Sequence, residues 1–369
     1  MKINKKIKQN KKQSSSKIKK YLINLLIFAA TTIICFFFCE IVTRVFFKDK
    51  IVLFPRYQTD AKYGEYRIRK IRPNLNFKHT SKDGSWKFTI NKQGFRSNYD
   101  FSYKKNPNTL RIIALGDSHT QGFEVRQDFT YSAVIEKHLN KHGYKSEVFN
   151  TGISGFSTAE ELVFLENEGV KYRPDFVVLG FYANDLEDNI KANIFVLNDN
   201  ELIVNKKEHI PGVRIQNIIY KIPLTKWLSE NSYFYSLLFN TTWDNIKKLL
   251  YRVKKDELVT EYAIPVEKIN DYQISLEGKL LERMYTFCKS NNIKLIILDI
   301  PTLQDSSFPL SLYQIAKNNC DIFITSDSVL NDYFDVAEIH LPYGHRHISE
   351  FTHILLGVTI AKSIIDNLN

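Results

Sequence analysis

The chain has 369 residues, of which 44% are hydrophobic and 13% aromatic, so it can build a large core and is too apolar to be mostly disordered. Its formal net charge is +11, but residues 1–20 alone hold nine lysines and no acid. Without that tail, 42 basic residues stand against 40 acidic ones. Because the excess charge is confined to the tail, the composition does not support a nucleic-acid-binding protein.

A long apolar stretch follows the tail. Residues 21–39, YLINLLIFAATTIICFFFC, contain no formal charge, and nineteen helical residues at ~1.5 Å each can cross a hydrocarbon core. A cleaved signal peptide would have an apolar core of about 7–15 residues ending at a small-residue site, and no such site is present. We therefore expect an uncleaved transmembrane anchor over 21–47. The positive-inside rule places the tail in the cytosol and the rest outside it, in a periplasm or at the cell surface.

The cysteines do not form a disulfide scaffold. Cys35 and Cys39 lie within the expected anchor, which leaves Cys288 and Cys320. These two are far apart in sequence, and they could either pair outside the cytosol or stay buried as free thiols.

Residues 51–108 are expected to be a small β-rich lead-in segment. In NLNFKHTSKDGSWKFTIN, polar and apolar residues alternate on both sides of Asp83-Gly84, a dipeptide that favours tight hairpins. We therefore predict two antiparallel strands joined at that turn.

From residue 109 to 369 the pattern changes to short apolar strands separated by helices. The expected strands are LRIIAL (110–115), KSEVFN (145–150), DFVVLGF (175–181) and KLIILDI (294–300). Continuous apolar strands with intervening helices indicate a parallel sheet covered on both faces, an α/β doubly wound domain.

An insertion at 190–272 interrupts this alternation. Its middle, LTKWLSENSYFYSLLFNTTWDNIKKLLYRVKK, has a helical and unusually aromatic pattern. It could be an additional packing pair of helices, a lid over a substrate, or a surface for a membrane or partner.

Polar residues follow the predicted strands at the edge where a doubly wound sheet binds its ligands. Ser118 follows the first strand, Gly155 lies after the second, and Asn184 follows the third. The histidine-rich run GHRHISEFTH precedes the last helix. Four loops therefore contribute a serine, a glycine, an asparagine and a histidine to one edge.

These blocks resemble those of the SGNH, or GDSL, hydrolase family. The sequence has GDSH, SGFS, YANDL and HISEFTH in the family's order, and the resemblance covers about residues 108–369. The upstream NKQGFR also looks like the lead-in of membrane-anchored bacterial members. The resemblance implies a flavodoxin-like, three-layer α/β/α hydrolase domain.

The resemblance also implies the roles of the site residues. Ser118 would be the nucleophile and His347 its general base, because a serine hydroxyl needs a base at neutral pH. The oxyanion would be held by the backbone N–H groups of Ser118 and Gly155 and by the side-chain amide of Asn184.

The histidine assignment rests on register. His340 precedes a leucine, as in the family's His-Leu pair. When the family's histidine is aligned with His347 instead, ILLGVTIAKSI follows as the closing helix without a gap. A zinc cluster of His340, His345, His347 and His353 lacks a carboxylate or cysteine at convincing ligand spacing, so we expect no cofactor and no metal.

The expected triad acid is missing. The family's acid stands three or two residues before the histidine, and Gly344 and His345 occupy those positions. Either a backbone carbonyl orients His347, or an acid from elsewhere reaches it. The candidates are Asp332, Asp335 and Glu338.

The sequence thus predicts a membrane-anchored, extracytoplasmic serine esterase acting on an ester-bearing glycan or lipid. The alternatives are an O-acyltransferase for a cell-envelope polysaccharide and a non-catalytic glycan-binding or assembly protein that keeps the fold.

Overall fold

A five-stranded parallel sheet forms the centre of the computed structural model, which describes residues 2–253, 270–303 and 308–368. The spatial order of the strands is β12-β11-β7-β5-β6. Their bounds are Leu110–Gly116 (β5), Ser146–Asn150 (β6), Phe176–Phe181 (β7), Lys294–Asp299 (β11) and Ile322–Ile324 (β12). In chain order this is the 2-1-3-4-5 arrangement of flavodoxin-like sheets. The predicted doubly wound fold is confirmed, although the sequence did not indicate the edge strand β12.

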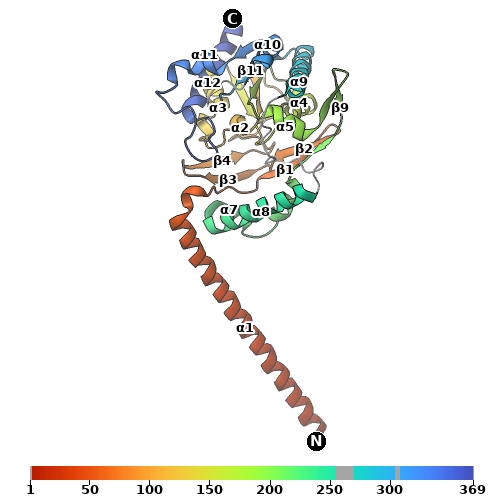
Figure 1. Ribbon diagram of the computed structural model, residues 1–369, viewed down its shortest axis with the longest axis vertical. Coiled ribbons are helices and arrows are strands. Elements are labelled where there is room, and N and C mark those ends of the chain that lie inside the picture. Colours follow the sequence, from red (N-terminus) through yellow and green to blue (C-terminus); the bar gives the residue numbers. More distant parts are fainter. Residues whose placement is uncertain (1, 254–269, 304–307, 369) are drawn as a thin grey trace.

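Helices cover both faces of this sheet (Figure 1). Ile112 and Ala114 of β5 pack with α3 (Tyr131–Lys141) and α12 (Glu350–Leu368). The alternate residues of β5, Ile113 and Leu115, belong to the core shared with α4 (Thr158–Asn167), α9 (Asp271–Ser290) and α10 (Leu310–Asn318). Because successive strand residues face opposite sides, a strand covered on both faces is apolar throughout, as the sequence pattern indicated.

The lead-in segment contains two antiparallel hairpins. Strands β1 (Gln58–Tyr63) and β2 (Tyr66–Ile71) form the first, and β3 (Leu75–Thr80) and β4 (Ser85–Ile90) form the second, around the predicted Asp83-Gly84 turn. Its side chains Phe77 and Phe88 belong to the same buried core as Leu115. The lead-in therefore packs on the large domain and shares its core.

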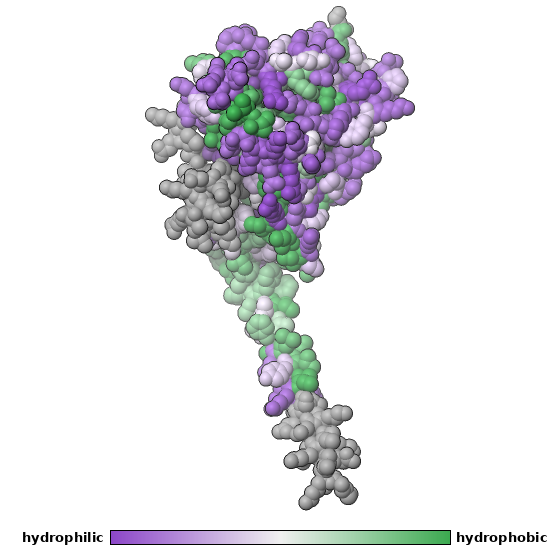
Figure 2. All heavy atoms as spheres, turned by 90° about the vertical axis from the view of Figure 1, so that its right-hand side faces the viewer, coloured by the Kyte–Doolittle hydropathy of each residue, from purple (hydrophilic) through white to green (hydrophobic). Residues whose placement is uncertain are grey.

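The N-terminal helix α1 (Lys2–Phe46) projects from the body as a stalk (Figure 1). Its stretch 17–46 is long and apolar enough to cross a membrane, and the most apolar part is not buried by the protein. Figure 2 shows hydrophobic residues along this stalk and beside it on the body, whereas most of the visible body surface is hydrophilic. All four cysteines are free, and Cys288 is buried.

The insertion combines strands with helices. It holds the hairpin β8 (Phe195–Asn198) and β9 (Glu201–Val204), and β10 (Glu208–His209) pairs in parallel with β2. Helices α6 (Val213–Tyr220), α7 (Thr225–Asn231) and α8 (Tyr233–Val253) follow, while residues 254–269 lie outside the described residues. The sequence predicted the helical middle but none of the three strands. In Figure 1, α7 and α8 lie beneath the lead-in, next to the end of α1.

Candidate active site

Ser118 stands at the first position of the short helix α2 (Ser118–Gln121), directly after strand β5. Asp117 caps this helix, because its Oδ1 accepts a 2.8 Å hydrogen bond from the N–H of His119. The preceding Gly116 has φ +149°, and a Cβ there would lie 1.9 Å from Thr120 Oγ1. This turn therefore requires glycine, and it presents Ser118 at the carboxyl edge of the sheet.

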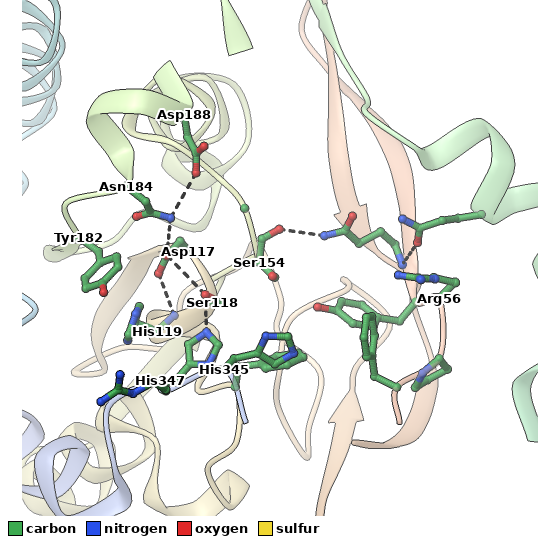
Figure 3. Close-up of a pocket in the computed structure, with 18 residues that line it drawn as sticks. Arg56, Asp117, Ser118, His119, Ser154, Tyr182, Asn184, Asp188, His345 and His347 are labelled. Atoms are coloured by element: carbon green, nitrogen blue, oxygen red, sulfur yellow. Dashed lines mark hydrogen bonds between the residues drawn. The ribbon is translucent and has the colours of Figure 1, made fainter. Parts of the chain in front are cut away.

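The structure brings His347 to Ser118. Its Nε2 lies 2.8 Å from the Ser118 Oγ, at hydrogen-bonding distance (Figure 3). Two other histidines near His347 in the sequence have different contacts. His340 Nε2 lies 3.0 Å from the carbonyl oxygen of Pro301, and the buried His353 accepts a hydrogen bond from the N–H of Tyr131. Only His347 of these three histidines contacts the serine.

A carboxylate that the sequence interpretation missed lies behind His347. Glu124 Oε2 is 3.5 Å from His347 Nδ1, an ion-pair contact that is longer than a closed hydrogen bond. The same oxygen accepts a 3.1 Å hydrogen bond from the N–H of His345. Catalytic contacts are often long in a free enzyme and tighten when substrate binds. The arrangement Ser118–His347–Glu124 therefore has the geometry of a catalytic triad.

Glu124 is fully buried and held from its other side by the lead-in. Its Oε1 lies 3.2 Å from Nε2 of His79, a fully buried residue of β3. Burial raises the pKa of Glu124, but the contacts with His347 and His79 more than offset this and leave its pKa well below the usual range. Burial lowers the pKa of His79, which favours a neutral ring that donates its Nε2–H. Glu124 is thus an ionised acceptor between two imidazoles.

The three acids considered from the sequence do not reach His347. Asp332, Asp335 and Glu338 are exposed, and within the described part of the chain none of them forms an ion pair with the ring. The carboxylate that forms an ion pair with this ring is instead Glu124. A usable signal was present, because Glu124 stands six residues after the serine in GDSHTQGFEV and must lie near the same turn.

The expected oxyanion groups line one cavity together with the serine. Ser118, Gly155 and Asn184 all border a cavity of about 280 Å³. The Asn184 Nδ2 donates to Asp117 Oδ2 and Asp188 Oδ2, each at 3.2 Å, and these bonds orient the amide beside the cavity (Figure 3). Gly155 has φ +79°, which glycine adopts readily. These groups lie on three different loops and converge on the serine.

Two buried arginines of the lead-in hold the loops of this site. Arg96, the last residue of NKQGFR, donates to the carbonyl oxygens of Gln121 (2.8 Å) and Val125 (2.6 Å), on either side of the turn that ends α2. Arg69 pairs with Glu160 at 2.9 Å and donates to the carbonyl oxygen of Gly155. The sequence indicated the motif but not this role. The lead-in thus fixes both the serine turn and the glycine loop.

The described residues contain no group of three or more His, Cys, Asp or Glu side chains arranged to hold a metal ion. Of the four histidines weighed for zinc, His345 contributes its backbone N–H to Glu124, and the other three have the separate contacts given above.

Comparison with known proteins identifies one family. Residues 114–257 match the GDSL-like lipase/acylhydrolase family, a stretch that includes Ser118, Gly155 and Asn184 and ends before His347. No curated protein matches the chain in sequence.

Several solved structures are similar to the chain. A two-domain esterase (CEX) active on acetylated mannans is 12% identical with a TM-score of 0.38, over 70% of this chain and 49% of that one. The psychrotrophic esterase EstA from Pseudoalteromonas sp. is 14% identical with a TM-score of 0.40, over 71% and 99%. The lipase/acylhydrolase from Enterococcus faecalis is 16% identical with a TM-score of 0.39, over 70% and 96%. The chain spans about half the length of the two-domain esterase.

Proposed function

We propose that the chain is a serine esterase with the triad Ser118, His347 and Glu124. It carries a domain of the GDSL-like lipase/acylhydrolase family, which makes it an ester-bond hydrolase. The observation that carries the proposal is the continuous line of contacts from the Ser118 hydroxyl through the His347 ring to Glu124, at 2.8 Å and 3.5 Å. This line contains a nucleophile, a base and an acid in the order that acyl transfer needs.

Each group has one step in the proposed reaction. The Ser118 Oγ attacks the ester carbonyl while its proton passes to Nε2 of His347. Glu124 keeps the Nδ1–H of His347 oriented and stabilises the imidazolium that forms. His347 then gives the proton to the leaving alcohol, which leaves an acyl group on Ser118. A water molecule gives its proton to His347 and attacks this acyl-enzyme, and His347 then returns that proton to the Ser118 Oγ as the acid leaves.

The oxyanion of each tetrahedral intermediate needs preorganised donors. The backbone N–H groups of Ser118 and Gly155 and the amide of Asn184 would supply them, since all three residues border the cavity. In the structure both N–H bonds of Asn184 are directed at Asp117 and Asp188, so one of them must turn to the oxyanion when the tetrahedral intermediate forms. Removing one such donor typically costs ~10²–10³ in rate.

The N-terminal helix supports an anchored enzyme whose hydrolase domain lies outside the cytosol. The lysine-rich tail precedes the apolar stretch, and the positive-inside rule keeps such a tail in the cytosol. An anchored site in that compartment fits an O-acyl group on an envelope glycan or a lipid ester as substrate.

Fluorophosphonate labelling of the full-length protein tests the serine mechanism. The wild type should label, whereas Ser118→Ala should not, and His347→Ala should label far more slowly. His340→Ala is the matched control for the second histidine variant, because His340 contacts the Pro301 carbonyl oxygen instead of the serine. An unlabelled wild type, or equal labelling of Ser118→Ala, would refute the proposal. Product analysis with and without a glycan acceptor would separate hydrolysis from acyl transfer.

A further inference from the structure

The anchor helix and the insertion are joined at one point. Glu40 of α1 accepts hydrogen bonds from the N–H groups of Tyr233 (3.1 Å) and Phe234 (2.9 Å), the first residues of α8. A carboxylate at a helix N-terminus satisfies unpaired donors and complements the helix dipole. Arg44, one turn further along α1, donates to the carbonyl oxygen of Asn231 at 2.8 Å. The start of α8 is therefore fixed to the end of the anchor.

This junction lies at the level where the apolar stretch ends. Glu40 directly follows the uncharged residues 21–39. Phe36, one turn earlier and inside that stretch, contacts Phe234 with ring centroids 5.6 Å apart. When residues 21–39 cross the hydrocarbon core, the beginning of α8 must then lie at the boundary between hydrocarbon and head groups.

Large hydrophobic side chains are exposed on α6, α7 and α8 and on the segment between α6 and α7. The most exposed of them are Ile218, Ile222, Leu224, Trp227 and Leu238. Lys221 and Lys226 stand among them in the sequence, and a mixture of Trp, Leu and Lys is typical of helices at a membrane interface. Single exposed hydrophobics are common, but five strongly exposed ones within 21 residues beside an anchor make this segment a candidate for membrane contact.

Leu224 carries a second, independent indication. Its φ is +68°, a left-handed conformation that is costly for a bulky residue, and its side chain is 72% exposed. The strained backbone exposes the Leu224 side chain to water, so the strain is not offset by packing within the protein. Contact with lipid would offset it, because removing the apolar side chain from water is favourable.

We propose that helices α6 to α8 lie on the membrane surface, with Leu224 and Trp227 inserted at the boundary between head groups and acyl chains. In Figure 1, α7 and α8 lie on the side of the body from which α1 emerges. The occupant of this face is the lipid bilayer that α1 crosses, since the junction at Glu40 holds both elements at the same depth.

Helix α6 forms part of the wall of the active-site cavity, and α8 contacts a residue of that wall. Gln216 of α6 and Arg56 both line that cavity. Arg56 donates to Asn240 of α8 at 3.2 Å, and its guanidinium also lies over the ring of Phe239. A membrane-seated insertion would therefore hold one wall of the cavity next to the lipid surface.

Spin labelling of the full-length protein in phosphatidylethanolamine/phosphatidylglycerol nanodiscs tests this proposal. Single labels are placed through Leu224→Cys, Leu310→Cys and Phe38→Cys in a background without native cysteines. Leu310 is the matched control, because it is the same residue type, is 95% exposed, and lies on α10 at the opposite end of the body from α1 (Figure 1). Phe38 reports on the anchor. Fluorophosphonate labelling or, independently of activity, the wild-type circular dichroism spectrum shows that each variant is folded.

The measured quantity is the ratio of collision rates with oxygen, which partitions into lipid, and with a water-soluble nickel chelate. We expect this ratio at position 224 to exceed that at position 310 by roughly three-fold or more and to approach that at position 38. Equal ratios at 224 and 310 would overturn the proposal. A position 224 that is shielded from both reagents would also overturn it, because another protein would then cover the face. Water access at position 38 would refute the anchor and the proposal together.

Discussion

Replacing Glu124 by glutamine is the most direct test of the proposed triad. The variant keeps the shape of the side chain and an oxygen that can accept from the His345 N–H, but it removes the charge. Two opposite charges 3.5 Å apart interact by about 5 kcal/mol at an effective dielectric constant of about 20. Since this attraction acts fully only when His347 carries the proton, nearly all of it is lost from the transition state. At ~1.4 kcal/mol per factor of ten, kcat should fall by about 10³.

The assay is kcat and KM for p-nitrophenyl acetate from pH 6 to 9, with circular dichroism to show that the variant is folded. Asp335→Asn is the matched control, because it removes an exposed carboxylate that the sequence had made a candidate, and its kcat should stay within about two-fold of wild type. If Glu124→Gln loses less than about five-fold in kcat while Ser118→Ala is inactive, His347 works without an acid and the assignment is refuted.

Three further predictions concern His79, Gly344 and Glu277. His79→Ala removes the donor to one oxygen of Glu124 and should lower kcat by about ten-fold with little change in KM. His79→Gln keeps a donor and should retain most of the wild-type kcat, and equal losses in both variants would contradict a positioning role for His79. Gly344→Ala should also lower kcat, because a Cβ would stand 2.1 Å from the Glu124 Oε1 and the backbone has φ +33°; wild-type kinetics would disprove this. Burial raises the pKa of Glu277 to about 7, so the folded protein binds this proton more tightly and its stability should fall as the pH rises from about 4.5 to about 7. Glu277→Gln should reduce the difference between the unfolding free energies at pH 5 and pH 8 by up to about 3 kcal/mol, and an unchanged difference would exclude the effect.

The sequence was sufficient to predict the sheet because its signal is local. An apolar strand such as 110–115 and a hairpin dipeptide such as Asp83-Gly84 are each decided by neighbouring residues. The short strand β10 was missed because it has only two residues and its partner, β2, is far away in sequence. Such strands have no periodicity of their own.

The site was predictable in part for a related reason. Ser118, Gly155 and Asn184 each follow a strand, so the topology of the sheet brings them together once the strands are known. Glu124 has no such position, since it stands in a turn with φ +62° and is recognisable only through the residues that surround it. Its neighbours are His79 from the lead-in and the loop 344–347 from the far end of the chain, a contact that no local pattern contains.

The lead-in belongs to the same structural unit as the proposed triad, even though its sequence pattern differs from that of the large domain. An ionised carboxylate in the interior is tolerated only when donors surround it, and His79 supplies one of the donors to Glu124. Arg69 and Arg96 satisfy carbonyl oxygens of the glycine loop and of the serine turn. Removing the lead-in would leave Glu124 short of a donor and both loops without their buried partners. The family match, which covers residues 114–257, contains the nucleophile and Glu124 but neither histidine that flanks this acid. The smallest segment that can hold the triad in working geometry must therefore begin before His79 and extend beyond His347.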